Sequence, residues 1–284
     1  MPPRDVPTAR EARLGAELRK MRERAGRTAH EAAAHIGTDR AKMSNIESGR
    51  RGISEGRIRK LADFYECHDA PYIDALCAIA REHRGQHWWE RYRGVLAPGA
   101  LDVSELEHHA TALHLVHLLL VPGIFQTEGY ARAILSSAIP GPDEEQLTAR
   151  VEHRVSRARI FQRPDPPRCE AIIHEAALRM RYGGRQVARG QLSHLLTVAE
   201  WPGVTLRVIP FALEDVPGHA QSMLYAEGPV PQLDTVQMDT PFGGVFLHSE
   251  HELKRYRRLC DAASALALDA EESRQLIRYL AREM

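Results

Sequence analysis

The sequence predicts a multidomain protein in which an all-α domain of five helices precedes a mixed α+β domain with a small sheet and many helices. Short helical patterns, each bounded by a capping residue or a glycine, fill the first 75 residues. Strand-like apolar runs lie after residue 165 and alternate there with helical segments. We therefore expect a flexible arm at 1–9, the helical domain at 10–75 and the α+β domain at 76–284.

The charge distribution agrees with this division. The whole chain carries 38 basic and 38 acidic side chains, which gives a formal net charge of zero. Residues 1–60 contain fifteen Lys or Arg and eight Asp or Glu, whereas the remainder contains twenty-three against thirty. The first part is therefore basic enough to attract a polyanion, although the whole chain is neutral.

Two of the five helices are indicated by apolar spacing, and a third is indicated by residues typical of a helix start. Between Glu11 and Ala25 the apolar residues recur at intervals of three and four, and Gly26 ends the pattern. A second amphipathic pattern runs from about Ser54 to Tyr65, and a further helix begins near Asp69 with Pro71 in its first turn. The helix at 11–25 is expected to pack behind the two short helices that follow it in the chain.

The other two helices are short and joined by a tight turn. Thr28 can cap a helix over 29–35, which should stop at Ile36 or Gly37 because glycine accommodates the left-handed conformation of a helix end. Thr38 or Asp39 can cap the second helix, which ends at Gly49 and has Met43 and Ile46 on its apolar face. This arrangement predicts a helix-turn-helix.

The side chains of the second short helix suit contact with DNA. Arg40 can bond guanine bidentately, Asn45 can bond adenine, and Lys42 can reach either a base edge or a phosphate. Arg50 and Arg51 follow the helix and can neutralise backbone phosphates. The alternative is an αα-hairpin that supports a core or binds protein, but the turn, the basic surplus and the IESGRR ending together favour DNA.

The stretch ELRKMRERAGRTAHEAAAHIGTDRAKMSNIESGRRGISEGRIRKLADFY resembles the DNA-binding domain of the phage-repressor and Cro type, often called the XRE (xenobiotic response element) family. The resemblance covers Leu14 to about Asp74 and implies that Arg40, Ala41, Lys42 and Asn45 face the bases. It places Ser44 and Arg50 near phosphate, and it pairs Arg22 with Glu47 in a buried ion pair. Ala29 stands where the family has a phosphate-binding Gln, so that contact is missing or is replaced by Thr28 or His30.

The complete expected DNA-binding set is Thr28, Thr38, Arg40, Ala41, Lys42, Ser44, Asn45, Arg50 and Arg51.

The second domain is predicted to mix helices and strands. Helices are expected at 106–120, 127–136, 144–162, 186–200, 253–267 and 270–282, and strands at 169–173, 205–209, 223–226, 235–238 and 245–248.

This region resembles the domain of unknown function that follows an XRE-type unit in many regulators from high-GC filamentous bacteria. The motifs are PGIFQTEGYARAIL, HRVSRARIF, IIHEAALRMRYGG, QLSHLLTVAEWPGVTLRVIPF and EESRQLI, within about residues 85–280. At 157–159 the sequence Arg-Ala-Arg replaces an expected Arg-Gln pair. The resemblance implies a role in transcriptional control, often alongside a small partner protein encoded nearby.

Other classes of protein have weaker support. The four cysteines are scattered, which indicates a reducing cytoplasm, and the longest apolar run, 113–125, is too short and too interrupted to cross a membrane. No signal peptide is expected at the N-terminus. We expect a cytoplasmic protein without a membrane partner.

Histidines raise the alternatives of a metal site or an enzyme. His83 and His87 are four residues apart, and His108, His109, His114 and His117 fall on the helix expected at 106–120. No cysteine or HExxH motif completes a ligand set, so we expect neither a metal nor another cofactor. His174 with Glu175 is a weak catalytic pair because the sequence has no nucleophile elbow or phosphate loop, and Glu175 is expected to start a helix or line a site. Trp88 and Trp89 could line a ligand pocket, but packing is the commoner role.

Together these features predict a sequence-specific DNA-binding transcriptional regulator, without enzymatic activity, whose second domain binds a small partner protein or an effector. A homodimer is expected because single units of this size bind DNA weakly. The alternatives are an antitoxin-like module whose main role is to bind a partner protein, and an enzyme with a histidine site fused to a DNA-binding domain.

Overall fold

The computed structural model describes residues 6–82, 87–139, 141–213, 221–240 and 243–284. The chain forms two compact units that divide between Arg91 and Tyr92. The domain boundary expected after residue 75 stays a prediction. Residue 75 itself lies within a continuous helix, Ala70–Arg81. The expected arm at 1–9 lies mostly outside the described residues; Thr8 caps the first helix and Ala9 begins it.

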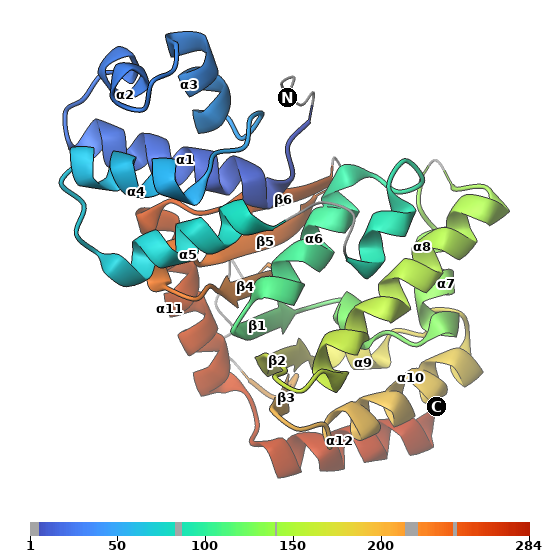
Figure 1. The fold of residues 1–284 in the computed structure, drawn as a ribbon. Coiled ribbons are helices and arrows are strands. Elements are labelled where there is room, and N and C mark those ends of the chain that lie inside the picture. The colour runs from blue at the N-terminus through green and yellow to red at the C-terminus, as the bar shows by residue number, and fades with distance from the viewer. Residues whose placement is uncertain (1–5, 83–86, 140, 214–220, 241–242) are drawn as a thin grey trace. The chain divides into compact units, whose positions relative to one another are not determined.

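The first unit contains the five predicted helices, coloured blue to cyan in Figure 1. They are α1 (Ala9–Arg24), α2 (Ala29–His35), α3 (Arg40–Glu47), α4 (Glu55–Phe64) and α5 (Ala70–Arg81). Their apolar faces form one core, whose fully buried members include Leu18, Ala32, Met43, Ile58, Leu61 and Leu76. Helix α3 packs against both α1 and α2, which fix its position.

Two glycines allow α1 to approach the end of α3 closely. A Cβ on Gly15 would lie 2.6 Å from the backbone oxygens of Ile46 and Glu47. A Cβ on Gly49 would lie 2.7 Å from the backbone of Ala12, and Gly49 also has a positive φ of 73°. The backbones can come this close only because neither residue has a side chain.

The second unit is built on a mixed sheet of six described strands, in the order β3-β2-β1-β4-β5-β6. The strands are β1 (Ala112–His117), β2 (Arg168–His174), β3 (Val204–Ile209), β4 (Met223–Glu227), β5 (Thr235–Thr240) and β6 (Gly243–Leu247). Strands β1, β2 and β3 are parallel, whereas β4, β5 and β6 join in antiparallel pairs. The fold class predicted from the sequence is therefore confirmed.

Helices cover both faces of this sheet (Figure 1). One core contains Leu113, Ala171 and Leu206 from the strands and lies against α7 (Glu128–Ser136), α10 (Arg185–Val198) and α12 (Ala270–Glu283). The other core contains Val116 and Ile172 and lies against α11 (Glu250–Leu266). The remaining helices are α6 (Pro98–His109), α8 (Glu144–Ser156) and α9 (Glu175–Arg179). Alternate residues of the central strands thus enter opposite cores.

The prediction of one helix was wrong. Residues 106–120 were expected to form a single helix, but α6 ends at His109 and β1 occupies Ala112–His117. Because β1 is a central strand buried on both faces, its sequence ALHLVH lacks the alternation that distinguishes a strand from a buried helix. The other predicted helices and the five predicted strands are present, with shifts at their ends; residues 157–162 form a short 3₁₀ helix after α8.

Candidate nucleic-acid interface

Local capping fixes the turn between α2 and α3. Thr28 accepts a hydrogen bond from the Glu31 backbone N–H, and the Glu31 carboxylate accepts from the Thr28 backbone N–H at 2.7 Å. Gly37 has φ of 66°, so α2 stops where the sequence predicted. Asp39 accepts from the Lys42 backbone N–H at 2.7 Å and is therefore the cap of α3, an alternative that the sequence left open with Thr38.

The outer side of α3 is exposed, and several of its polar side chains have no partner within the described residues. Arg40, Ala41, Lys42 and Ser44 are exposed and Asn45 is half-buried, whereas Met43 and Ile46 are buried in the core. Within the described residues, the side chains of Arg40 and Asn45 have no hydrogen-bond or ionic partner. The same holds for Arg50, which is exposed, and Arg51, which is half-buried. These groups are free to bond an external acceptor.

Three of the expected contact residues are already hydrogen-bonded, ion-paired or half-buried. Lys42 Nζ lies 2.8 Å from Asp39 Oδ2, and this exposed pair lowers the pKa of Asp39. The Thr28 hydroxyl donates to Glu31 at 2.7 Å, so it has less capacity for a phosphate. Thr38 is half-buried in the turn, where its backbone N–H donates to the Ala33 carbonyl.

Arg22 and Glu47 connect α1 to the last residue of α3. Arg22 Nε donates to Glu47 Oε1 at 2.6 Å and Nη2 donates to Oε2 at 3.0 Å. The side chains are only 12% and 8% exposed, and the hydrogen bond to Glu47 raises the pKa of Arg22. Arg22 Nη1 also donates to the Arg27 carbonyl. Glu47 is thus turned toward α1, as the family resemblance implied. It does not project as a free anion from the outer side of α3.

A second buried carboxylate, which the sequence did not indicate, ties α1 to α5. Glu17 is 1% exposed and accepts from Tyr72 Oη at 2.6 Å and from Arg13 Nε at 2.8 Å. Burial, followed by the hydrogen bond to Glu17, raises the pKa of Tyr72. No spacing rule connects Glu17 with a residue 55 positions later, so only the tertiary structure identifies this network.

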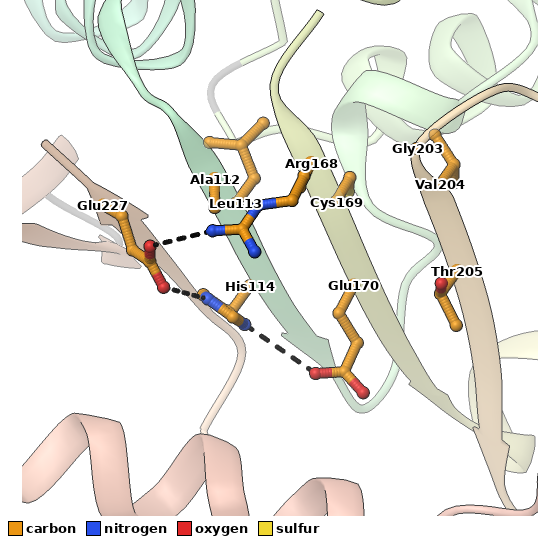
Figure 2. A pocket seen from close by; sticks show the side chains of 10 residues that line it. All are labelled: Ala112, Leu113, His114, Arg168, Cys169, Glu170, Gly203, Val204, Thr205 and Glu227. Carbon is orange, nitrogen blue, oxygen red and sulfur yellow. Dashed lines mark hydrogen bonds and ion pairs between the residues drawn. The ribbon is translucent and has the colours of Figure 1, made fainter. Parts of the chain in front are cut away.

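In the second unit, a hollow of about 420 Å³ lies at the start of the parallel strands (Figure 2). Sheet register aligns His114 with Glu170 and Glu170 with Thr205. His114 Nε2 lies 2.8 Å from Glu227 Oε1, and its Nδ1 lies 3.7 Å from Glu170 Oε2. Figure 2 shows the imidazole between the two carboxylates.

His114 and Glu170 in this hollow shift each other's pKa values. Hydrogen bonding to Glu170, and to Glu227, raises the pKa of His114 despite partial burial. The pKa of Glu170 falls to about 2, first through His114 and then through Ser264 and Arg207. Ser264 Oγ donates to Glu170 Oε1 at 3.0 Å. At neutral pH the ionised Glu170 carboxylate therefore already has cationic and hydroxyl partners inside the unit.

The structure separates the histidines that the sequence placed on one helix. His108 and His109 end α6, whereas His114 and His117 belong to β1. His83 lies outside the described residues. His174 caps α9, and Glu175 is the first residue of that helix, as predicted; its carboxylate accepts from the Phe211 backbone N–H and pairs with Arg179. Over the described residues, no three His, Cys, Asp or Glu side chains are arranged to hold a metal ion.

Trp89 and three of the cysteines have the packing roles expected of buried side chains. Trp89 is 2% exposed, and its ring stacks on the ring of His87 with centroids 4.5 Å apart. Cys77, Cys169 and Cys260 are buried free thiols, and Cys67 is half-buried.

No helix in the described ranges has the length and apolar character needed to span a membrane.

Family comparisons agree with this division of the chain. A model described as a helix-turn-helix domain matches residues 13–75. A model described as a domain of unknown function, DUF5753, matches residues 101–279, which is more than half of the chain. No curated protein and no solved structure matches the sequence.

Proposed function

Because this chain belongs to the DUF5753 family and carries a helix-turn-helix domain, we propose that it is a sequence-specific DNA-binding transcriptional regulator. One observation carries the proposal: α3 is anchored by its buried side while Arg40 and Asn45 on its outer side have no partner among the described residues. Side chains of these types bond purine edges in the major groove. Helix α3 acts as the recognition helix, of the Cro and repressor type.

The remaining groups divide between bases and backbone. Ala41 can contact a thymine methyl group, and Ser44, Arg50 and Arg51 face phosphates. Lys42 must leave Asp39 to reach DNA, and this costs little because exposed ion pairs contribute at most about 1 kcal/mol. Binding therefore needs only a side-chain rearrangement at α3.

An electrophoretic shift with DNA flanking the protein's own gene tests this function. We expect a shifted band that a shuffled duplex does not compete away, and its loss in Arg40→Ala/Asn45→Ala. The matched control, Arg181→Ala/Gln186→Ala, likewise removes one arginine and one side-chain amide, from exposed positions in the second unit, and should bind normally. Equal binding to the specific and shuffled duplexes would refute sequence-specific recognition.

We further propose that the second unit supplies the input and the dimer contact. It has its own two-sided core, as a separately folded ligand-binding or partner-binding domain requires. The input is a small partner protein or an effector, and an effector would be sought first in the hollow beside His114. A homodimer would present two α3 helices to half-sites one turn of DNA apart. A monomer by light scattering, together with a non-palindromic site, would contradict this arrangement.

The antitoxin-like alternative predicts a different binding preference for the full chain. In that case the full chain would bind its small partner protein tightly but would show no preference among DNA sequences. Turnover of a substrate, or a tightly bound metal in the purified protein, would favour an enzyme instead. We propose a cytoplasmic regulator without catalytic activity.

A further inference from the structure

Helix α11 carries a basic face that the proposed role of the first unit does not use. The sequence Lys254-Arg-Tyr-Arg-Arg258 lies in its second and third turns. Lys254, Arg255 and Arg258 are exposed, and among the described residues none of their side chains has an ionic or hydrogen-bond partner. They project within about 100° of one another around the helix axis, since an α-helix turns about 100° per residue. We call these three residues the basic face.

Among the described residues, the charged side chains next to the basic face in α11 do not neutralise it. Arg257, which projects elsewhere, donates to Asp234 at 2.6 Å and to Tyr225 Oη at 2.7 Å. Glu252 is engaged in the cap of α11 with Ser249. Two acidic residues lie near this face in sequence: Glu250, four residues before Lys254, and Asp261, three residues after Arg258. Among the described residues, no ion pair joins either of them to the three cations. The basic face is left with three unneutralised cations.

We propose that the basic face is a second DNA-contact surface, which binds backbone phosphates without reading sequence. This inference rests on the proposed DNA-binding function. A phosphate backbone presents closely spaced negative charges, and each cation that neutralises one releases a condensed counterion. The second unit would thereby hold DNA beside the specific site and would add affinity that is independent of sequence.

The composition of α11 favours nucleic acid over a membrane surface. A membrane-bound amphipathic helix needs large apolar side chains next to its cations. The apolar side of α11 instead enters the core of the second unit through Leu253, Cys260 and Ala263. The outer side of α11 continues with Ala262, which is half-buried, and Ala265, which is exposed, and both side chains are small. Because the same chain carries the helix-turn-helix domain, DNA binding there would raise the local concentration of phosphates available to the second unit.

The test is the salt dependence of binding by the full-length chain. A fluorescein-labelled duplex of 60 base pairs and mixed sequence is titrated at several KCl concentrations, with fluorescence anisotropy as the readout. Lys254→Gln/Arg255→Gln/Arg258→Gln should make the slope of log K against log salt shallower by about 2.7, at about 0.9 per phosphate contact. Arg255→Lys/Arg258→Lys keeps the charges and should keep the slope.

The control variant is Arg181→Gln/Arg189→Gln/Arg282→Gln. It removes three exposed cations associated with α10 and α12, on the opposite face of the sheet, and changes the net charge equally. Its slope should match the wild-type slope. If both triple variants lower the slope equally, the effect is one of overall charge and the inference is overturned.

The outcomes separate this inference from the proposed function. A wild-type slope retained by the basic-face variant overturns the inference alone, and leaves an acidic protein as the partner to test for that surface. Absence of any wild-type binding to DNA overturns both. Thermal melting of each variant, followed by circular dichroism, establishes that the substitutions leave the fold intact.

Discussion

Arg22 and Glu47 form a two-point ion pair that joins α1 to the C-terminal end of α3, with Arg22 Nε 2.6 Å from Glu47 Oε1. This pair fixes the orientation of α3 from the side that faces α1. It also removes from the outer side of α3 a carboxylate that would repel phosphate. One interaction therefore contributes both to the stability of the first unit and to the electrostatics of its proposed interface.

Glu47→Ala is predicted to lower stability as well as DNA binding. Breaking one partner of a buried pair leaves an uncompensated charge and typically costs about 3 to 5 kcal/mol. Urea denaturation and anisotropy binding measure the two effects. Asp74→Ala, which breaks an exposed pair with Arg59 and leaves Arg22 untouched, is the control and should change stability little. Unchanged stability with lost binding in Glu47→Ala would indicate a direct DNA contact instead.

Gly15→Ala is predicted to displace α3 from α1. The added methyl group would meet the backbone oxygens of Ile46 and Glu47, and overpacking of this kind costs about 1 to 3 kcal/mol. Thermal melting and DNA affinity should both fall. Gly56→Ala in α4 is the matched control: its Cβ has no atom within 4 Å, so the helix should be stabilised by about 0.5 to 1 kcal/mol. Equal effects of the two substitutions would mean that close approach is unimportant.

Asn45→Ala is predicted to change sequence preference. A bidentate contact with a base contributes about 1 to 3 kcal/mol of discrimination at one position. Competition binding against duplexes varied at each base pair would show relaxed preference at one position in each half-site. Ser44→Ala, by contrast, should weaken binding to all duplexes alike, because Ser44 is assigned to phosphate. A uniform loss in Asn45→Ala would reassign that residue to the backbone.

Much of the first unit could be predicted because its signals are local. Capping residues, glycines and apolar spacing occur within a few residues of the structure they specify, as at Thr28, Gly37 and Asp39. The outward and inward sides of α3 follow from the same periodicity. The Glu17 network was not predictable in this way, since Tyr72 reaches it only after the chain has folded.

The second unit shows where local signals are insufficient. Strand β1 was predicted as helix because burial on both faces removes the alternation of apolar and polar residues. Without that strand, the sequence could not place His114 beside Glu170, which lies in the neighbouring strand 56 positions later. The hollow was therefore missed, although each of its titratable residues was visible in the sequence.

The cluster in the hollow is predicted to make stability depend on pH. The pKa of His114 is raised, so its contribution is fully present below its unfolded value of about 6.5 and is lost as pH rises through the folded value. The pKa of Glu170 is lowered to about 2, so its contribution is present above its ordinary value of about 4.5 and is lost as pH falls toward 2. Both contributions coexist between about pH 4.5 and 6.5.

His114→Gln should therefore destabilise the chain by about 1 kcal/mol at pH 5.5, and by less at pH 8.5, where wild-type His114 has lost more of its charge. Urea denaturation followed by tryptophan fluorescence at the two pH values measures this difference. His194→Gln is the control, because burial lowers the pKa of His194 and its loss removes no ion pair. The same destabilisation by His114→Gln at both pH values would rule out a charged His114 as the cause.

The most direct test of DNA binding through α3 and the residues that follow it is the salt slope of the full-length chain on its own upstream DNA. We predict a clearly negative slope of log K against log salt, at about 0.9 per phosphate contacted, that becomes shallower by about 1.8 in Arg50→Ala/Arg51→Ala. A wild-type slope near zero would contradict phosphate-driven binding by the helix-turn-helix domain.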